Sequence, residues 1–172
     1  KSAEGGVTAG YEGGDDAQVK VTFKSTEQNI ALIRAFSALA DAVAENNPIK
    51  SAEYLEASEH AKAFVLSMYD KELNCFYTGT ENDGTTISKG VIPLDANALT
   101  ILILGSELED AYSVLSFVEN RMSVGDGFAF SAGDLDGIWN EGTAQMAACY
   151  NQLGATDKYE KTMQYLKKQT AK

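Results

Sequence analysis

The sequence predicts an all-α fold made of three antiparallel helical hairpins, and two observations support this. Three long segments hold a single charge between them, that of Arg34: residues 28–40, 96–106 and 142–156. A charged, amphipathic segment follows each one closely: residues 53–62, 107–121 and 157–168. A helix that is apolar on all sides is buried, whereas a helix with one apolar stripe covers it from outside. Each pair therefore predicts an inner helix followed by an outer helix.

An arm is expected to precede the helical part of the chain. Residues 1–18 are rich in glycine and aspartate, which is typical of loops and partly ordered arms. Residues 19–23 alternate between apolar and polar side chains and predict a short strand. We therefore assign residues 1–24 to the arm and residues 25–172 to the helical domain.

The first hairpin has recognisable helix-end signals. Ser25 is followed three residues later by Gln28, a capping-box pattern that predicts the start of the inner helix. The Asn-Asn-Pro sequence at residues 46–48 is expected to end this helix, because proline cannot continue one. The outer helix is then expected to begin near Ser51.

The second inner helix follows a long connection over residues 70–92. This connection is expected to contain a β-hairpin, because strand-like residues flank an Asn-Asp-Gly turn at 82–84. Pro93 is expected at or just before the start of the helix. The helix itself is expected over residues 94–104, with Gly105 as its end.

A second long connection, over about residues 123–139, contains four glycines and three aspartates. Asn140 is expected to cap the third inner helix, which runs to Leu153 and stops at Gly154. Short links join each inner helix to its outer helix, so the two are antiparallel neighbours. All inner helices should then start at the end of the molecule where the long loops gather. Long loops in compact domains are usually functional, so we expect the functional site at that end.

Composition excludes several classes of partner. The net charge of −11 argues against nucleic acid and anionic membranes as partners, because both are bound through lysine and arginine. No apolar run approaches the roughly 18 residues that span a bilayer, so we expect no membrane insertion. Cys75 and Cys149 are isolated, and we expect no zinc site and no cofactor. Asp134 and Asp136 leave a calcium loop as an alternative, although the full EF-hand spacing is absent.

The predicted inner helices share one chemical feature, a carboxylate with amides close to the helix start. The residues are Glu27, Gln28 and Asn29, then Asp95 and Asn97, then Trp139, Asn140, Glu141 and Gln145. Taken singly, each acid fits a helix terminus, because acids favour the first turn. Together, carboxylates, amides and an aromatic ring suit a polyhydroxylated ligand such as a glycan.

Paired carboxylates also cleave glycosidic bonds, one donating a proton and the other activating water. If the domain is catalytic, we predict Glu141 as the general acid and Asp95 or Glu27 as the base. Trp139 is predicted to stack on a sugar ring, and its alternative role is that of a loop or core anchor.

Five stretches of the sequence resemble motifs of bacterial six-hairpin glycosidase-like proteins. They are residues 11–15, 25–30, 76–80, 92–95 and 136–145, within a resemblance that covers about residues 10–168. The resemblance implies an (α/α)6 toroid, a link to carbohydrate metabolism and export from the cytoplasm. It also implies a ligand cleft where the inner helices start, lined by Glu27, Asp95 and Glu141. Tyr77 joins the predicted sugar-binding residues through its motif.

This sequence departs from the resemblance in having three hairpins instead of six, about half of a toroid. We therefore expect it to be a fragment of a longer protein, or to associate with another chain that completes the ring. The leading hypothesis is a glycoside-hydrolase-like domain that acts on an oligosaccharide or polysaccharide. The alternatives are a non-catalytic glycan-binding or protein-interaction module and an inactive fragment. A sugar isomerase or epimerase is disfavoured, because such sites generally rely on histidine and the chain has only His60.

Overall fold

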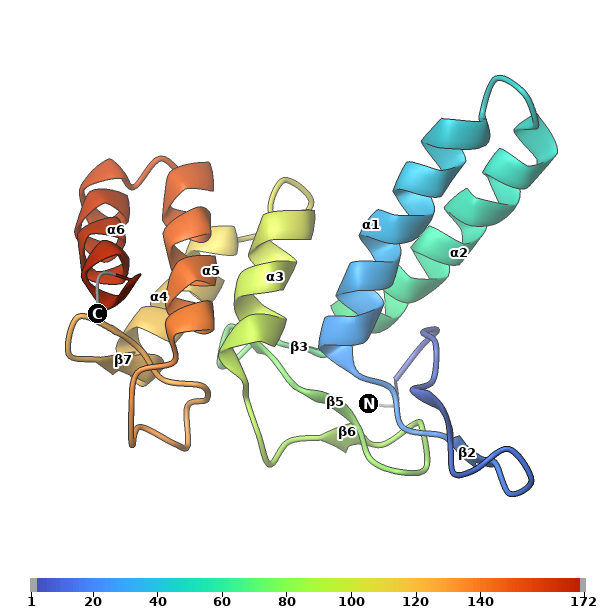
Figure 1. The fold of residues 1–172 in the computed structure, drawn as a ribbon, viewed down its shortest axis with the longest axis horizontal. Helices are drawn as coiled ribbons and strands as arrows, with labels where there is room; N and C mark the ends of the chain where they lie inside the picture. The colour runs from blue at the N-terminus through green and yellow to red at the C-terminus, as the bar shows by residue number, and fades with distance from the viewer. Residues whose placement is uncertain (1–2, 171–172) are drawn as a thin grey trace. The chain divides into compact units, whose positions relative to one another are not determined.

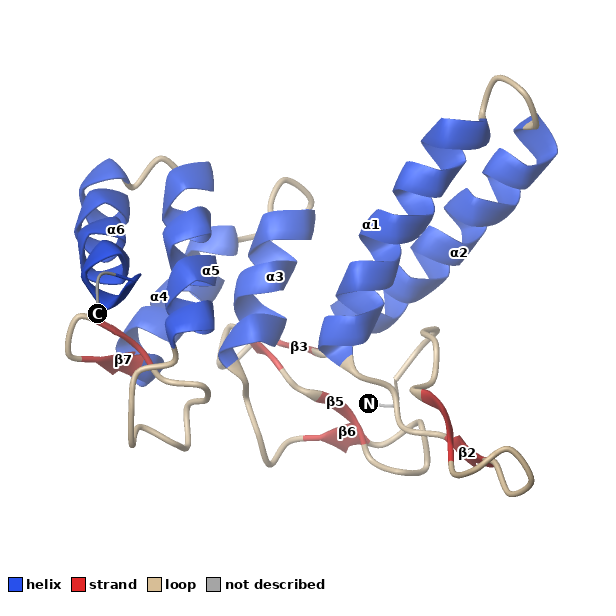
Figure 2. Ribbon diagram, viewed as in Figure 1, coloured by secondary structure: helices blue, strands red, loops and turns tan. Residues whose placement is uncertain are grey.

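The computed structural model describes residues 3–170, which form six helices and eight short strands (Figures 1 and 2). The helices follow one another as three consecutive pairs, with small antiparallel strand pairs in the connections. This confirms the predicted all-α class with helical hairpins. The chain divides into two compact units, residues 3–69 with 76–89 and residues 70–75 with 90–170. The predicted boundary between residues 24 and 25 stays a prediction.

The elements have the following bounds. The helices are α1 (Thr26–Val43), α2 (Pro48–Ser67), α3 (Leu94–Leu104), α4 (Ala111–Met122), α5 (Asn140–Gln152) and α6 (Thr156–Thr170). The strands are β1 (Gly10–Glu12), β2 (Val19–Val21), β3 (Tyr69–Asp70), β4 (Cys75–Phe76), β5 (Gly79–Thr80), β6 (Ile87–Ser88), β7 (Ser123–Val124) and β8 (Gly127–Phe128). Each odd-numbered strand pairs with the next strand along the chain. The predicted strand is β2, the predicted hairpin is β5–β6, and β1 lies within the segment predicted as an arm.

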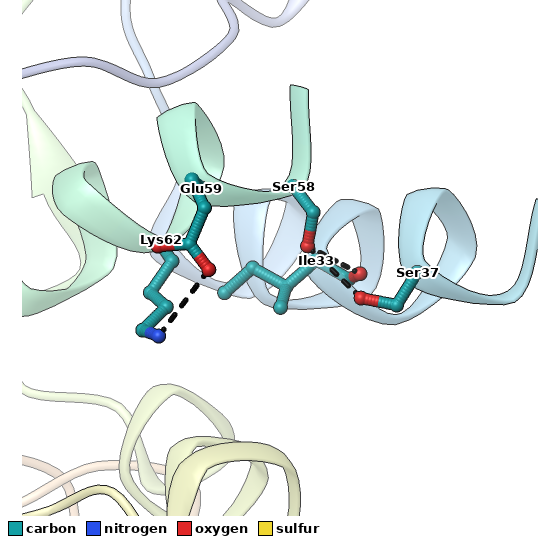
Figure 3. Close-up of polar contacts among 5 residues, drawn as sticks. All are labelled: Ile33, Ser37, Ser58, Glu59 and Lys62. Carbon is teal, nitrogen blue, oxygen red and sulfur yellow. Dashed lines mark hydrogen bonds and ion pairs between the residues drawn. The ribbon is translucent and has the colours of Figure 1, made fainter. Parts of the chain in front are cut away.

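The first unit contains the α1–α2 hairpin, whose two helices are joined by polar as well as apolar contacts. The Ser58 hydroxyl on α2 donates to the Ile33 carbonyl on α1 at 3.0 Å and lies 3.0 Å from the Ser37 hydroxyl (Figure 3). Lys62 and Glu59 form an ion pair at 3.4 Å along α2. The Ser25 hydroxyl accepts from the Gln28 amide, which confirms the predicted N-terminal cap of α1.

The prediction that the first inner helix is buried on all sides is wrong. Ile30 and Ile33 are buried against α2, but Arg34 is exposed and Leu39 is 44% exposed. The segment carries little charge partly because it is rich in alanine, a small residue that occurs on surfaces as well as in cores. α1 therefore has one buried stripe and one exposed side.

The predicted start of the second helix is also wrong, by three residues. α2 begins at Pro48 rather than near Ser51, and Asn47 is its N-cap. The Asn47 side chain accepts from the Lys50 amide at 3.0 Å. Proline suits the first position of a helix, because the amide hydrogen that it lacks would have no partner there. Pro48 therefore begins α2, whereas α1 already ends at Val43.

Loss of this cap gives a small, measurable effect on stability. Asn47→Ala is expected to lower the free energy of unfolding by about 1 kcal/mol, because the Lys50 amide loses its acceptor. Denaturant unfolding measures the change. Asn46→Ala alters the same exposed link without removing a cap and serves as the control. Equal effects of the two substitutions would contradict the capping role.

The second unit is built around α3, most of which is buried, although Leu99, Leu102 and Ile103 are partly exposed. Leu94, Ala98, Ile101 and Leu104 are at most 1% exposed. α5 packs against α3, and the Cys149 thiol donates to the Ala98 carbonyl across this contact at 3.3 Å. Cys149 is thus a small, fully buried residue of this core.

The long connection before α5 lies beside the start of both inner helices of this unit. The Leu94 amide donates to the Phe130 carbonyl at 2.8 Å, and the Trp139 amide donates to the Phe128 carbonyl at 2.7 Å. α3 and α5 therefore start at the same end of this unit, next to this loop, as predicted (Figure 1). Among residues 3–170, no helix combines the length and apolar character needed to cross a bilayer.

The ends of these helices agree with the sequence in part. Pro93 is the N-cap residue of α3, and Gly154 follows the end of α5 with a left-handed φ of 73°, both as predicted. The prediction that Asn140 caps α5 is wrong, because Trp139 occupies the cap position. The Asn140 side chain instead accepts from the Tyr165 hydroxyl at 3.2 Å.

Candidate functional site

Two carboxylates lie in the first turns of α3 and α5, at the end where both helices start. Asp95 is half-buried, and Glu141 is exposed. Burial raises the pKa of Asp95, the Ala96 amide that donates to it at 2.6 Å lowers it, and the charge of Glu141 raises it. The two carboxylates are thus close enough to interact electrostatically. The structure brings together two of the three predicted catalytic acids.

The third predicted acid, Glu27, lies in the first turn of α1 and belongs to the other unit. Its carboxylate is exposed. Its role as a base stays a prediction.

Two aromatic rings stand at the same end of the second unit. Trp139, at the N-cap of α5, is partly exposed, and Phe130 is 46% exposed. Their ring centroids are 5.2 Å apart with an interplanar angle of 71°, an edge-to-face arrangement. The Phe130 carbonyl accepts from the first residue of α3, so this ring lies between the starts of the two helices. Sequence reasoning identified Trp139 and missed Phe130.

Gly142 makes the position of the indole possible. A Cβ at this position would lie 2.3 Å from Cε3 of Trp139 and 3.0 Å from Cδ2 of Leu94. The indole therefore rests directly on the first turn of α5, where any side chain would displace it. The constraint comes from packing, because the backbone here is ordinary helix.

The predicted amide ligands of this unit are placed differently from one another. Asn97 is fully buried, and its amide donates to the Pro93 carbonyl at 2.8 Å, within the first turn of α3. Gln145 lies one turn after Glu141, and its Oε1 is enclosed without a hydrogen-bond donor among residues 3–170. Of these two amides, Gln145 has the acceptor that a ligand hydroxyl would satisfy.

Two further predicted ligands belong to the first unit and are buried. The Asn29 amide donates to the carbonyls of Val7 and Ser25 and accepts from the Val7 amide, so it holds the N-terminal segment on α1. Tyr77 is buried, with the Lys89 ammonium 5.4 Å from its ring centre. Their roles as sugar ligands stay predictions.

The raised pKa of Asp95 predicts how stability depends on pH. Its ordinary pKa is 3.8 and its folded pKa is higher, so ionisation costs more in the folded state than in the unfolded one. The stability that the protonated carboxyl provides is complete below pH 3.8 and is lost as the pH rises through the folded pKa. Asparagine does not ionise, so Asp95→Asn is not subject to this loss of stability.

Asp95→Asn is therefore expected to melt at a higher temperature than the unsubstituted chain at pH 7, with a smaller difference near pH 3.5. Thermal unfolding at the two pH values measures both differences. Asp136→Asn, at an exposed position of the loop, is the control. A lower melting temperature of Asp95→Asn at pH 7 would show that the carboxylate stabilises the fold.

Comparison with known proteins identifies the architecture. No family model matches the sequence, and no curated protein matches it. Among solved structures, the cellobiose 2-epimerase from Spirochaeta thermophila DSM 6192 is similar, with a TM-score of 0.58 and 18% sequence identity. The match covers 95% of this chain and 46% of that one. The fold is that of part of an α/α toroid.

The neighbour is a glycosidase-like (α/α)6 toroid, and the chain spans about half of its length. This confirms the predicted architecture, including the prediction of about half a ring. An identity of 18% shows the fold alone. An inference about function must therefore come from the residues themselves, here those at the starts of α3 and α5.

Proposed function

We propose that the end of the second unit where α3 and α5 start binds a carbohydrate. The supporting observation is that two partly exposed aromatic rings, Phe130 and Trp139, stand at the same helix starts as the interacting carboxylates Asp95 and Glu141. The glycosidase-like fold supports the ligand class. The similar protein is named for its action on cellobiose, a sugar.

Each part of this site suits one part of a sugar. The faces of Phe130 and Trp139 offer apolar surface for the C–H groups of a pyranose ring. The carboxylates accept hydrogen bonds from hydroxyl groups, and Gln145 Oε1 lacks a donor that a hydroxyl would provide. A few polar groups beside aromatic surface are typical of small-molecule sites.

If the site is catalytic, the carboxylates have different roles, and we assign them in reverse to the sequence prediction. Asp95 is half-buried with a raised pKa, so it keeps its proton to a higher pH and suits the general acid. Glu141 is exposed, and its charge acts on Asp95, so it suits the base that activates water.

Tryptophan fluorescence tests the binding proposal, because Trp139 is the only tryptophan in the chain. Titration with oligosaccharides is expected to give a saturable change in emission. Phe130→Ala is expected to weaken binding at least tenfold, about 1.4 kcal/mol. Tyr11→Ala, at a residue that is 66% exposed in the other unit, is the matched aromatic control. A panel of oligosaccharides that leaves the emission unchanged would contradict the proposal.

Product analysis distinguishes hydrolysis from binding alone. A saturable complex that releases no new reducing ends during long incubation would favour a glycan-binding module. Release of shorter sugars would favour a hydrolase.

A further inference from the structure

A second cavity in the same unit contains none of the residues proposed to bind carbohydrate. It has a volume of about 380 Å³ and lies between α4, the turn that joins β3 to β4, and the segments before α3 and α5. Its volume is within the range of small-molecule sites, roughly 300–1,000 Å³. It could therefore hold a ligand independently of the carbohydrate site.

Two side chains of opposite charge line the cavity. Arg121 is in the last turn of α4, and Glu72 is in the β3–β4 turn. Among residues 3–170, neither side chain forms an ion pair within 4.0 Å, with the other or with a third group. Arg121 is tolerated at its position without a carboxylate, because a cation at a helix C-terminus is favourable. Both charges are therefore available to a ligand.

The rest of the lining is apolar or neutral. Ile92, Phe117 and Ala132 are partly exposed to the cavity, and Leu73 is 48% exposed at its rim. Exposure of apolar side chains to water is unfavourable, so an apolar ligand group that covered Leu73 and Phe117 would gain free energy. The cavity thus combines an apolar surface with one cation and one anion.

Local hydrogen bonds fix the turn that carries Glu72. The Asp70 carboxylate accepts from the amides of Glu72 and Leu73 at 2.9 and 3.1 Å. The Asn74 amide donates to the Asp70 carbonyl at 2.8 Å, and Asn74 adopts a left-handed φ of 57° that asparagine tolerates. These hydrogen bonds hold the rim of the cavity in one conformation.

We propose that this cavity binds a small zwitterion with an apolar body, of the class of the free apolar α-amino acids. The Arg121 guanidinium binds the carboxylate through paired hydrogen bonds, which its planar geometry favours. Glu72 binds the ammonium group. The apolar side chain of the ligand packs against Phe117, Ile92 and Leu73.

Isothermal titration calorimetry of the whole chain with L-leucine tests this proposal. Saturable binding is expected, and Arg121→Gln and Glu72→Gln are each expected to weaken it at least tenfold. Arg34→Gln is the matched control, because Arg34 is also an exposed arginine, in the other unit. Thermal unfolding of each variant confirms that the fold is retained.

Two leucine derivatives test the two charges separately. N-acetyl-leucine lacks the ammonium group and leucinamide lacks the carboxylate, and each is expected to bind at least tenfold more weakly than leucine. Equal binding of N-acetyl-leucine would show an anion site alone and overturn the proposal. The absence of saturable heat with leucine would also overturn it. Neither outcome depends on carbohydrate binding, which tryptophan fluorescence measures separately.

Discussion

Asp95→Asn is expected to lower the rate of glycoside hydrolysis by about 100- to 10,000-fold, the usual contribution of a general acid. The reason is that asparagine cannot donate a proton to the leaving oxygen. Steady-state rates with an unactivated oligosaccharide measure the loss. The rate of the unsubstituted chain should also fall at high pH, because a general acid must be protonated to donate. Burial and the charge of Glu141 raise the pKa of Asp95, so this fall occurs as the pH rises through that raised pKa.

The leaving group distinguishes an acid from a residue that only maintains the site. An aryl glycoside with a good leaving group needs little proton donation, so Asp95→Asn should lose far less activity on it. Glu141→Gln, which removes the proposed base, should lose activity on both substrates. An equal loss on both substrates in Asp95→Asn would contradict the acid role. A complete lack of hydrolysis by the unsubstituted chain would contradict catalysis and leave the binding function.

Gly142→Ala is expected to damage both stability and sugar binding. The new methyl group would lie 2.3 Å from the indole of Trp139, which must move away from the first turn of α5. Such overpacking typically lowers the free energy of unfolding by about 1–3 kcal/mol. Affinity for the sugar should fall at least tenfold, because the displaced indole no longer stands beside Phe130.

Gly137→Ala is the matched control for this substitution. Gly137 lies five residues earlier, and a Cβ there would meet nothing within 4 Å. Its stability should change by a few tenths of a kcal/mol at most. Denaturant unfolding and sugar titration on the two variants make the comparison. Unchanged tryptophan emission and sugar affinity in Gly142→Ala would show that the indole position does not matter for binding.

The distribution of charge predicted the helical pairs, because charged side chains are rarely buried and an uncharged segment can therefore lie in a core. It succeeded best at α3, where large apolar residues such as Leu94, Ile101 and Leu104 are buried. It failed at α1, because alanine lowers the charge of a segment without requiring burial. Pro48 was misplaced because proline ends one helix and begins another by the same physical properties.

The sequence predicted those site residues whose location follows from their position in a helix. Asp95 and Glu141 were identified because acids in the first turns of helices that start at one end must lie near each other. Phe130 was missed because its place depends on a backbone hydrogen bond to Leu94, which no local pattern specifies. The difference in burial between Asp95 and Glu141, which reverses their assigned roles, depends on tertiary packing in the same way.

Amide chemical-shift mapping of the labelled chain during titration with an oligosaccharide identifies the carbohydrate site most directly. We expect saturable shifts in residues 94–97, 128–131 and 138–145, which surround the starts of α3 and α5. Phe130→Ala should reduce these shifts at the same sugar concentration. Saturable shifts confined to another part of the chain, or no shifts with any oligosaccharide, would contradict a carbohydrate site at this end of the unit.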